Sequence, residues 1–326
     1  MTISRRTFSM AAVFLAAVPV LAAAQGYPNK PVKILVPFAA GGTTDIVARI
    51  VSIKLGQELG QPVIVENRAG GGGTVGADAL AKSPPDGYTL GIATVSTIGT
   101  NPATNPKMPY DPIKDFTAII SLVNVPNVMT VNPNKVPAKD MKEFIALLKK
   151  NPDKHSYASS GSGGISHMDG EYFKILTGTS MVHVPYRGSG PALNDTIAGQ
   201  VDSQMDNLPS SLPHIQAGKL RALAVMAPRR VDSLPEVPTF AELGLKDLNN
   251  EAWYGLIAPA NLPADIRAKL HAAAQKTLND PEVRKRLVEN GCAVDGGSPQ
   301  DFEKKMAREL ALRKDIVKKA NIKLEQ

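Results

Sequence analysis

Short apolar runs and longer amphipathic stretches alternate along this chain, and the first pair sets the pattern for the rest. The run Ile34–Val36 has the length and the β-branched character of a buried strand. Beyond Pro37 and the pair Gly41-Gly42, apolar positions recur at near-helical spacing from Thr43 onwards. These positions are Ile46, Val47, Ile50, Ile53 and Leu55. The pattern therefore predicts a strand, a glycine turn and a helix that begins at Thr43.

Similar units follow in the first part of the chain. The predicted elements are strands at 62–66 and 88–93 and a helix at 74–82. Strands that alternate with helices at this spacing predict a parallel sheet with right-handed crossovers. The carboxyl ends of such strands share one edge of the sheet, which is where ligands bind in open α/β proteins. Residues 39–43, 67–74 and 94–97, including Ser96, are therefore expected to face one crevice.

The second part of the chain repeats this logic without repeating the sequence. Asp140 and Glu143 resemble a capping box at the start of a helix. The strand at 157–159 leads through glycines to a helix from about Ser166, and the strand at 182–184 leads to a helix from Pro191. A strand at 201–205 then ends at Asp206. Small, polar or glycine-rich turns are again expected to share one edge.

Two crossings between these halves define the predicted organisation. The chain is expected to leave the first lobe at Pro126-Asn127 and to return at Ala227-Pro228, before a strand at 253–258 and three helices. The predicted divisions are a signal peptide at 1–24, a first lobe at 25–125 and 229–326, and a second lobe at 126–228. Glycine-rich edges that face each other across two lobes indicate a clam-shell binding protein.

The turn at Gly41-Gly42 carries the clearest candidate chemistry. A strand, a glycine turn and a helix start leave backbone N–H groups unpaired, and the helix dipole adds positive potential. Both favour an anion, and glycine permits positive φ and close approach of a ligand. On its own, the motif is better explained as a plain tight βα turn. The rest of the chain favours a carboxylate cradle built from backbone amides.

The first 24 residues have the pattern of an export signal. Arg5-Arg6 precedes the apolar run 10–20, and Leu21–Ala24 supplies small residues for cleavage. The run is too short to span a bilayer comfortably. The segment 4–8 resembles a twin-arginine signal, but an ordinary secretory signal fits as well. Either route predicts a periplasmic protein.

Charge and cysteine content exclude several other classes. The formal net charge of +7 falls by two when Arg5 and Arg6 are removed, and the basic residues are scattered rather than clustered. Nucleic-acid binding would require a basic stripe with interleaved aromatics. The single cysteine, Cys292, excludes an intramolecular disulfide. The five histidines do not fall at metal-ligand spacing, so neither a metal nor a cofactor is predicted.

Motifs spread over the whole mature chain resemble the substrate-binding proteins of tripartite tricarboxylate transporters, the Bug family. They are Tyr27-Pro28-x-x-Pro31, Val36-Pro37-Phe38-x-x-Gly41-Gly42-x-x-Asp45, Val65-Glu66-Asn67-Arg68-x-Gly70, Asp86-Gly87-Tyr88-Thr89-Leu90, Val184-Pro185-Tyr186-x-Gly188, Leu220-Arg221-Ala222-Leu223-Ala224, Pro235-x-Val237-Pro238-Thr239 and Trp253-x-Gly255. The resemblance implies a type II-like, two-lobe periplasmic-binding fold. Each lobe would be a mostly parallel sheet flanked by helices, with the ligand cleft between them. It also implies a monomer that delivers a small organic acid to membrane permease subunits.

The resemblance also implies a site made largely of loop amides, often with bridging waters. In the first lobe the candidates are Phe38, Ala39, Gly41, Gly42 and Asp45. In the second lobe they are Ser160, Gly161, Gly163, Gly164 and His167, with Asp206 and Asn207 at the neighbouring strand end. Asp45 is a poor direct ligand for a carboxylate because like charges repel, so it is expected to brace the loop or hold a water. Whether His167 contacts the ligand is left open, since only its neutral form suits a helix N-terminus.

Two alternatives use the same crevice. One is a receptor for a sensor kinase, with the same binding chemistry. The other is an exported hydrolase built on Ser162, His167 and Asp206, but the Gly-x-Ser-x-Gly elbow is missing and the order of these residues is not that of an α/β-hydrolase. The sequence does not decide between mono- and dicarboxylates, or between aliphatic and aromatic acids.

Overall fold

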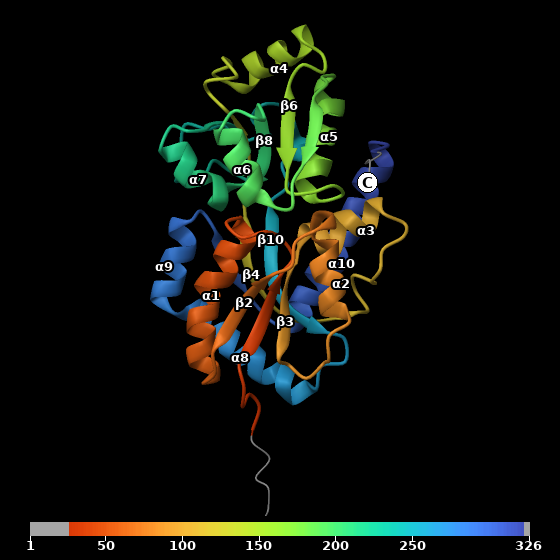
Figure 1. Ribbon diagram of the computed structural model, residues 1–326, viewed down its shortest axis with the longest axis vertical. Helices are drawn as coiled ribbons and strands as arrows, with labels where there is room; N and C mark the ends of the chain where they lie inside the picture. Colours follow the sequence, from red (N-terminus) through yellow and green to blue (C-terminus); the bar gives the residue numbers. More distant parts are fainter. Residues whose placement is uncertain (1–25, 323–326) are drawn as a thin grey trace, which may run out of the picture.

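The computed structural model describes residues 26–322. The predicted signal peptide lies outside the described residues. Two α/β lobes are stacked along the long axis of the molecule, each with its own sheet (Figure 1). The predicted two-lobe fold is confirmed. The chain crossings described below connect the two lobes.

Within residues 26–322, six strands form the sheet of the first lobe. In spatial order they are β11 (Ala293–Gly296), β4 (Phe116–Val125), β10 (Ala252–Pro259), β3 (Thr89–Thr94), β1 (Val32–Val36) and β2 (Val63–Asn67). β1 pairs in parallel with β2 and β3, as the alternation of strands and helices predicts. β10 runs antiparallel to both β3 and β4, and β11 runs antiparallel to β4.

The second lobe contains a five-stranded sheet within the same residues. Its spatial order is β7 (Val182–Pro185), β6 (Ser156–Ser159), β8 (Ser203–Asn207), β5 (Asn127–Val131) and β9 (Arg221–Met226). β6 pairs in parallel with β7 and β8, whereas β5 is antiparallel to β8 and β9. Both sheets are therefore mixed rather than mostly parallel. The strands that run against the others are β10 and β11 in the first lobe and β5 in the second.

Helices cover both sheets (Figure 1). Those of the first lobe are α1 (Thr43–Leu59), α2 (Thr74–Ala81), α3 (Asn101–Thr104), α8 (Ala264–Asn279), α9 (Pro281–Glu289) and α10 (Pro299–Lys319). Those of the second lobe are α4 (Met141–Lys150), α5 (Ile165–Thr177), α6 (Ser189–Ile197) and α7 (Leu208–Gln216). α1 starts at the predicted residue, although Ile53, which the pattern places with the apolar positions, is 60% exposed. No helix in the described part of the chain is long and apolar enough to cross a membrane.

The return crossing lies later than predicted. Residues beyond Ala227 stay with the second lobe: the Phe240 amide donates to the Val225 carbonyl at 3.0 Å, and the Phe240 ring is fully buried in the second-lobe core. Leu248 belongs to the same core. The chain re-enters the first lobe where β10 begins, near Ala252, and not at Ala227-Pro228. The apolar residues of this segment are needed to cover β9, so the lobe does not end at its last strand.

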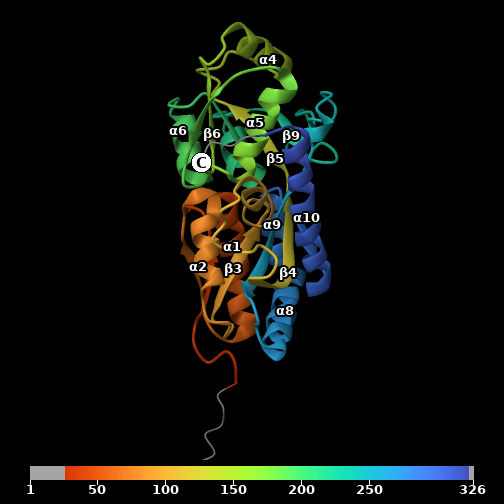
Figure 2. The ribbon, with the colours of Figure 1, turned by 90° about the vertical axis from the view of Figure 1, so that its right-hand side faces the viewer.

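The longest helix, α10, belongs to the first lobe but runs up beside the second (Figure 2). Its N-cap Ser298 accepts from the Asp301 amide, as Ser298-Pro299 suggests. Phe302 and Met306 near its start are buried in the first-lobe core. Its second half brings Arg313 within reach of α5 in the second lobe. The two lobes are therefore joined by a helix as well as by the crossings.

Candidate functional site

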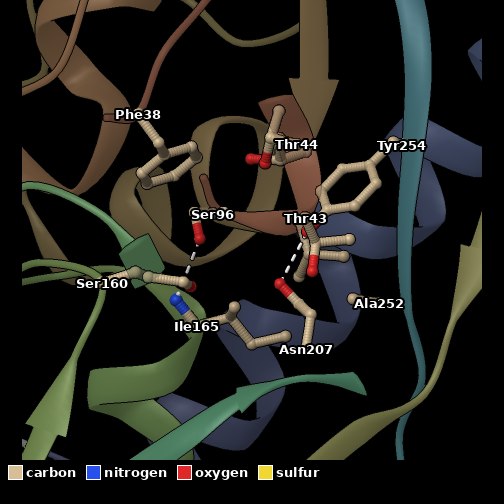
Figure 3. Close-up of a pocket in the computed structure, with 13 residues that line it drawn as sticks. Phe38, Thr43, Thr44, Ser96, Ser160, Ile165, Asn207, Ala252 and Tyr254 are labelled. Atoms are coloured by element: carbon tan, nitrogen blue, oxygen red, sulfur yellow. Dashed lines mark hydrogen bonds between the residues drawn. The ribbon is translucent and has the colours of Figure 1, made fainter. Parts of the chain in front are cut away.

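A small cavity of about 20 Å³ lies between the two lobes, where the ends of strands and the starts of helices meet (Figure 3). Its lining comes from both lobes and from β10. The lining residues are Phe38, Gly42, Thr43, Thr44, Thr94, Val95, Ser96, Ser160, Ile165, Ser189, Asn207, Ala252 and Tyr254. The predicted crevice therefore exists, and of the predicted site residues it contains Phe38, Gly42, Ser96, Ser160 and Asn207.

The N-terminus of α1 supplies hydrogen-bond donors to this cavity. Its first intrahelical bond runs from the Ile46 amide to the Gly42 carbonyl, so the amides of Thr43 and Thr44 have no acceptor within the helix. Gly41 has a φ of +82°, a conformation that glycine adopts without strain. A Cβ on Gly42 would lie 3.3 Å from the Ser189 Cβ, so the second lobe closes directly over this turn. The arrangement suits an anion at the helix start.

Asp45 holds this turn in place. Its carboxylate accepts from the Gly41 amide at 3.1 Å, from Arg49 Nε at 3.0 Å and from Asn67 Nδ2 at 3.0 Å. Burial alone would raise the pKa of Asp45, but the hydrogen bonds from Arg49, Gly41 and Asn67 outweigh it and lower the pKa. Asp45 is not among the cavity-lining residues. These contacts support the bracing role expected for it.

Contacts between the lobes surround the cavity. The Ala39 amide donates to the Arg187 carbonyl at 3.0 Å, and the Ile165 amide donates to Ser96 Oγ at 3.0 Å. Thr43 Oγ1 lies 2.8 Å from Ser210 Oγ. Ala39 and Ser96, both predicted as ligand contacts, thus connect the lobes in this structure.

The glycine turn of the second lobe differs from that of the first, because its amides already have partners. The Gly161 amide donates to Ser159 Oγ at 3.2 Å, and the Gly163 amide donates to His167 Nδ1 at 3.1 Å. The Gly164 amide donates to the Gly161 carbonyl, and the Ser160 amide donates to Ser166 Oγ. Ligand contact through these residues stays a prediction.

His167 is buried behind the cavity lining, with a 2% exposed side chain. Its ring stacks on that of His183, with the centroids 3.7 Å apart. Because Nδ1 accepts from the Gly163 amide, the neutral ring carries its proton on Nε2. Burial lowers the pKa of His167 to about 4, and burial together with the neighbouring His167 lowers the pKa of His183 to about 3. Both rings are therefore neutral near pH 7.

Asp206 lies at the end of β8, and three hydroxyl groups surround it. Ser189 Oγ donates to Oδ1 at 2.5 Å, while Ser210 Oγ and Ser211 Oγ both donate to Oδ2 at 2.7 Å. Burial raises the pKa of Asp206, and the three serine hydroxyls act against that rise. Asp206 lines a second small cavity of about 10 Å³, which shares Ser160, Ile165 and Asn207 with the first.

The hydrolase arrangement is not assembled. His167 Nδ1 is engaged with the Gly163 amide, and Asp206 is engaged with three serines other than Ser162. Within residues 26–322, no group of three or more His, Cys, Asp or Glu side chains is placed to hold a metal ion.

Several lining residues were missed by sequence reasoning. Tyr254 OH donates to Asn207 Oδ1 at 2.6 Å, which connects β10 to the second lobe. Ser189 is the first residue of α6, beside a motif used for recognition, but nothing in its local sequence indicates a partner such as Asp206. Thr43 lies within the range 39–43 that was expected to face the crevice, and Thr44 could have been included with it, because the first residues of a helix carry the free amides.

A cavity enclosed by two α/β lobes and provided with helix N-termini defines a solute-binding protein. The chain belongs to the family described as tripartite tricarboxylate transporter family receptor, whose profile matches residues 47–322. BugT of Bordetella pertussis is 33% identical over 323 residues, which cover 98% of this chain and 99% of BugT. The family resemblance drawn from the sequence motifs is therefore confirmed.

Solved structures agree with this assignment. One, described as a periplasmic transporter, has 53% identity and a TM-score of 0.89, and the match covers 91% of this chain and 99% of that one. Rpa4515 of Rhodopseudomonas palustris, solved with adipate, has 35% identity, a TM-score of 0.87 and the same two coverages. MatC of the same organism, solved with malate, has 35% identity and a TM-score of 0.86, covering 89% of this chain and 100% of MatC.

Proposed function

We propose that this protein captures a small carboxylic acid between its lobes in the periplasm and delivers it to the permease subunits of a tripartite tricarboxylate transporter. The observation that carries the proposal is the start of α1, where the amides of Thr43 and Thr44 lack intrahelical acceptors beside a cavity between the lobes. The relatives solved with adipate and malate support the same ligand class.

Closure of the lobes over the acid is the step that a permease would recognise. Contacts such as Ala39 to Arg187 and Ile165 to Ser96 form only when the lobes meet. A ligand that fills the space between the lobes favours the arrangement that has these contacts, because it interacts with both lobes at once. No chemical step is assigned to the site, and the acid is released unchanged.

The binding proposal is tested by thermal melting of the mature protein with a panel of small carboxylic acids, after unfolding and refolding to remove any bound ligand. A ligand at one hundred times its Kd stabilises the folded state by about 2.7 kcal/mol, which raises the melting midpoint by several degrees. A shift with at least one acid that is recovered unchanged supports the proposal. A refolded protein that shifts with none of the acids overturns it.

Export is tested with the full chain in cells. Processing of the N-terminus and recovery in the periplasmic fraction are the expected results. The double substitution Arg5→Lys, Arg6→Lys keeps the charge of the signal and separates the two export routes. Retention of the variant inside the cell indicates the twin-arginine route, whereas normal export indicates the ordinary one. Cytoplasmic retention of the wild-type chain overturns the periplasmic assignment.

A further inference from the structure

Two hydroxyl groups that line the cavity, those of Ser189 and Thr43, have their protons committed away from it. Ser189 Oγ donates its one proton to Asp206 Oδ1 at 2.5 Å. A serine hydroxyl has one proton and two lone pairs, and an ionised carboxylate is an acceptor only. The hydrogen-bonding capacity that Ser189 still offers is therefore that of an acceptor.

The direction in which Thr43 donates its hydroxyl proton follows from the same donor and acceptor counts. Ser210 Oγ lies 2.7 Å from Asp206 Oδ2, and at this distance it must donate, because two facing lone pairs would repel. The 2.8 Å contact between Ser210 Oγ and Thr43 Oγ1 is then donated by Thr43. Thr43 Oγ1 also accepts from the Ser210 amide at 3.1 Å. Asp206 thus orients both cavity-lining hydroxyls from behind.

Ser189 Oγ and Thr43 Oγ1 together form an acceptor surface. It lies directly beside the amides at the start of α1, because a Cβ on Gly42 would be 3.3 Å from the Ser189 Cβ. Asp206 is also without a basic partner: within residues 26–322, no Lys, Arg or His nitrogen lies within 4.0 Å of its carboxylate oxygens. A buried carboxylate behind the surface disfavours a ligand oxygen anion there and favours a hydrogen-bond donor.

We infer that the site selects carboxylic acids that carry a hydrogen-bond donor, a hydroxyl or an ammonium group, on the carbon next to the bound carboxylate. The carboxylate of the acid accepts hydrogen bonds from the amides at the start of α1, and the donor group on the neighbouring carbon donates to Ser189 Oγ. Phe38 and Ile165, which also line the cavity, are left to contact the apolar part of the acid. This inference rests on the carboxylate-binding function proposed above.

The test compares matched acids by calorimetric titration of the refolded mature protein. The sets are propionate, lactate and alanine; succinate, malate and aspartate; and glutarate, 2-hydroxyglutarate and glutamate, with both enantiomers of the chiral acids. In each set the members differ only in the group on the neighbouring carbon. In the set that binds, a donor-bearing acid is expected to bind at least about tenfold more tightly than its parent, because an unmet buried acceptor is costly. The better of the hydroxyl and ammonium members identifies the donor.

A parent acid that binds as tightly as both donor-bearing members overturns the inference while leaving the carboxylate receptor intact. A protein that binds no acid in any set overturns the receptor proposal and this inference together. The two failures are therefore distinguishable.

Ser189→Ala removes the acceptor, and it is expected to reduce the preference for the donor-bearing acid over its parent to less than about threefold. The control is Ser203→Ala, on the same strand as Asp206, where the buried hydroxyl donates to the Ser156 carbonyl instead. This control should keep the full preference. An unchanged preference in a folded Ser189→Ala variant, or an equal loss in Ser203→Ala, contradicts the role given to Ser189.

Discussion

Arg313 of the first lobe lies 3.8 Å from Asp169 of the second, measured from Nη1 to Oδ1, and both side chains are almost completely buried. Arg313 is on α10 and also donates through Nε to Glu309 Oε1 at 2.6 Å. Trp253 Nε1 donates to the other oxygen of Glu309 at 2.8 Å. Burial raises the pKa of Asp169 to about 7, with Arg313 lowering it and Glu309 adding to the rise. The contact between the lobes therefore includes a buried charge cluster on the α10 side, apart from the residues that line the cavity.

Arg313→Met is expected to destabilise the protein by about 3–5 kcal/mol, because it leaves two carboxylates buried without a cation. Urea unfolding of the ligand-free protein measures the change. Arg308→Met, at an exposed position on the same helix, is the control and should stay within about 0.5 kcal/mol of the wild type. Adding Asp169→Asn to Arg313→Met should recover part of the loss. A wild-type stability for Arg313→Met would show that the cluster contributes nothing.

The stacked histidines predict a loss of stability in mild acid. The folded state lowers the pKa of His167 to about 4, so the unfolded chain takes up a proton first as the pH falls below about 6.5. The contribution of the neutral His167 to the free energy of unfolding is complete above this pH and is lost as the pH falls towards 4. By pH 5 this effect costs about 2 kcal/mol.

His167→Gln keeps an acceptor for the Gly163 amide and removes the titration. Unfolding free energies of the variant should therefore fall less between pH 7 and pH 5 than those of the wild type. His271→Gln, at a solvent-exposed hydrogen bond to the Gly297 carbonyl, serves as the control and should follow the wild type. Identical pH profiles for His167→Gln and the wild type would contradict the burial argument.

Gly41→Val tests the amide cradle. Gly41 has a φ of +82°, where a β-branched residue is strained by about 1–3 kcal/mol, so the turn is expected to move and acid binding to weaken at least tenfold. Gly60→Val is matched in strain, since Gly60 has a φ of +69° with open space around it at the far end of α1. Gly60→Val should bind normally. Equal affinities in the two folded variants would contradict the cradle.

Ser96→Ala tests whether the contacts between the lobes support binding. The variant leaves the Ile165 amide without its acceptor when the lobes meet, which costs about 1 kcal/mol and should weaken acid binding about fivefold. Ser52→Ala removes a hydroxyl that donates within α1 and should leave the affinity unchanged. Small-angle scattering of the ligand-free Ser96→Ala variant should show a larger mean radius. An unchanged affinity would assign Ser96 a local role only.

The order of strands, turns and helices near the site was predictable from the sequence because it depends on neighbouring residues. Ile34–Val36, the turn at Gly41-Gly42 and the helix from Thr43 follow from apolar spacing and from the freedom of glycine at positive φ. The positions of the strand ends located Gly42 and Ser96 at the cavity, and the family resemblance added Phe38 and Ser160.

The tertiary structure alone decided which polar groups remain available. Gly41 and Gly163 look alike in sequence, yet the Gly163 amide is taken by His167 and the amides that follow Gly41 stay free. The partners of Asp206 and the pairing of Arg313 with Asp169 depend on residues distant in the chain or in the other lobe. The segment that follows Ala227 likewise joins the second lobe because its apolar side chains cover β9. Local sequence determines the conformation of each turn, whereas the packing of distant elements determines which of its hydrogen bonds are already made.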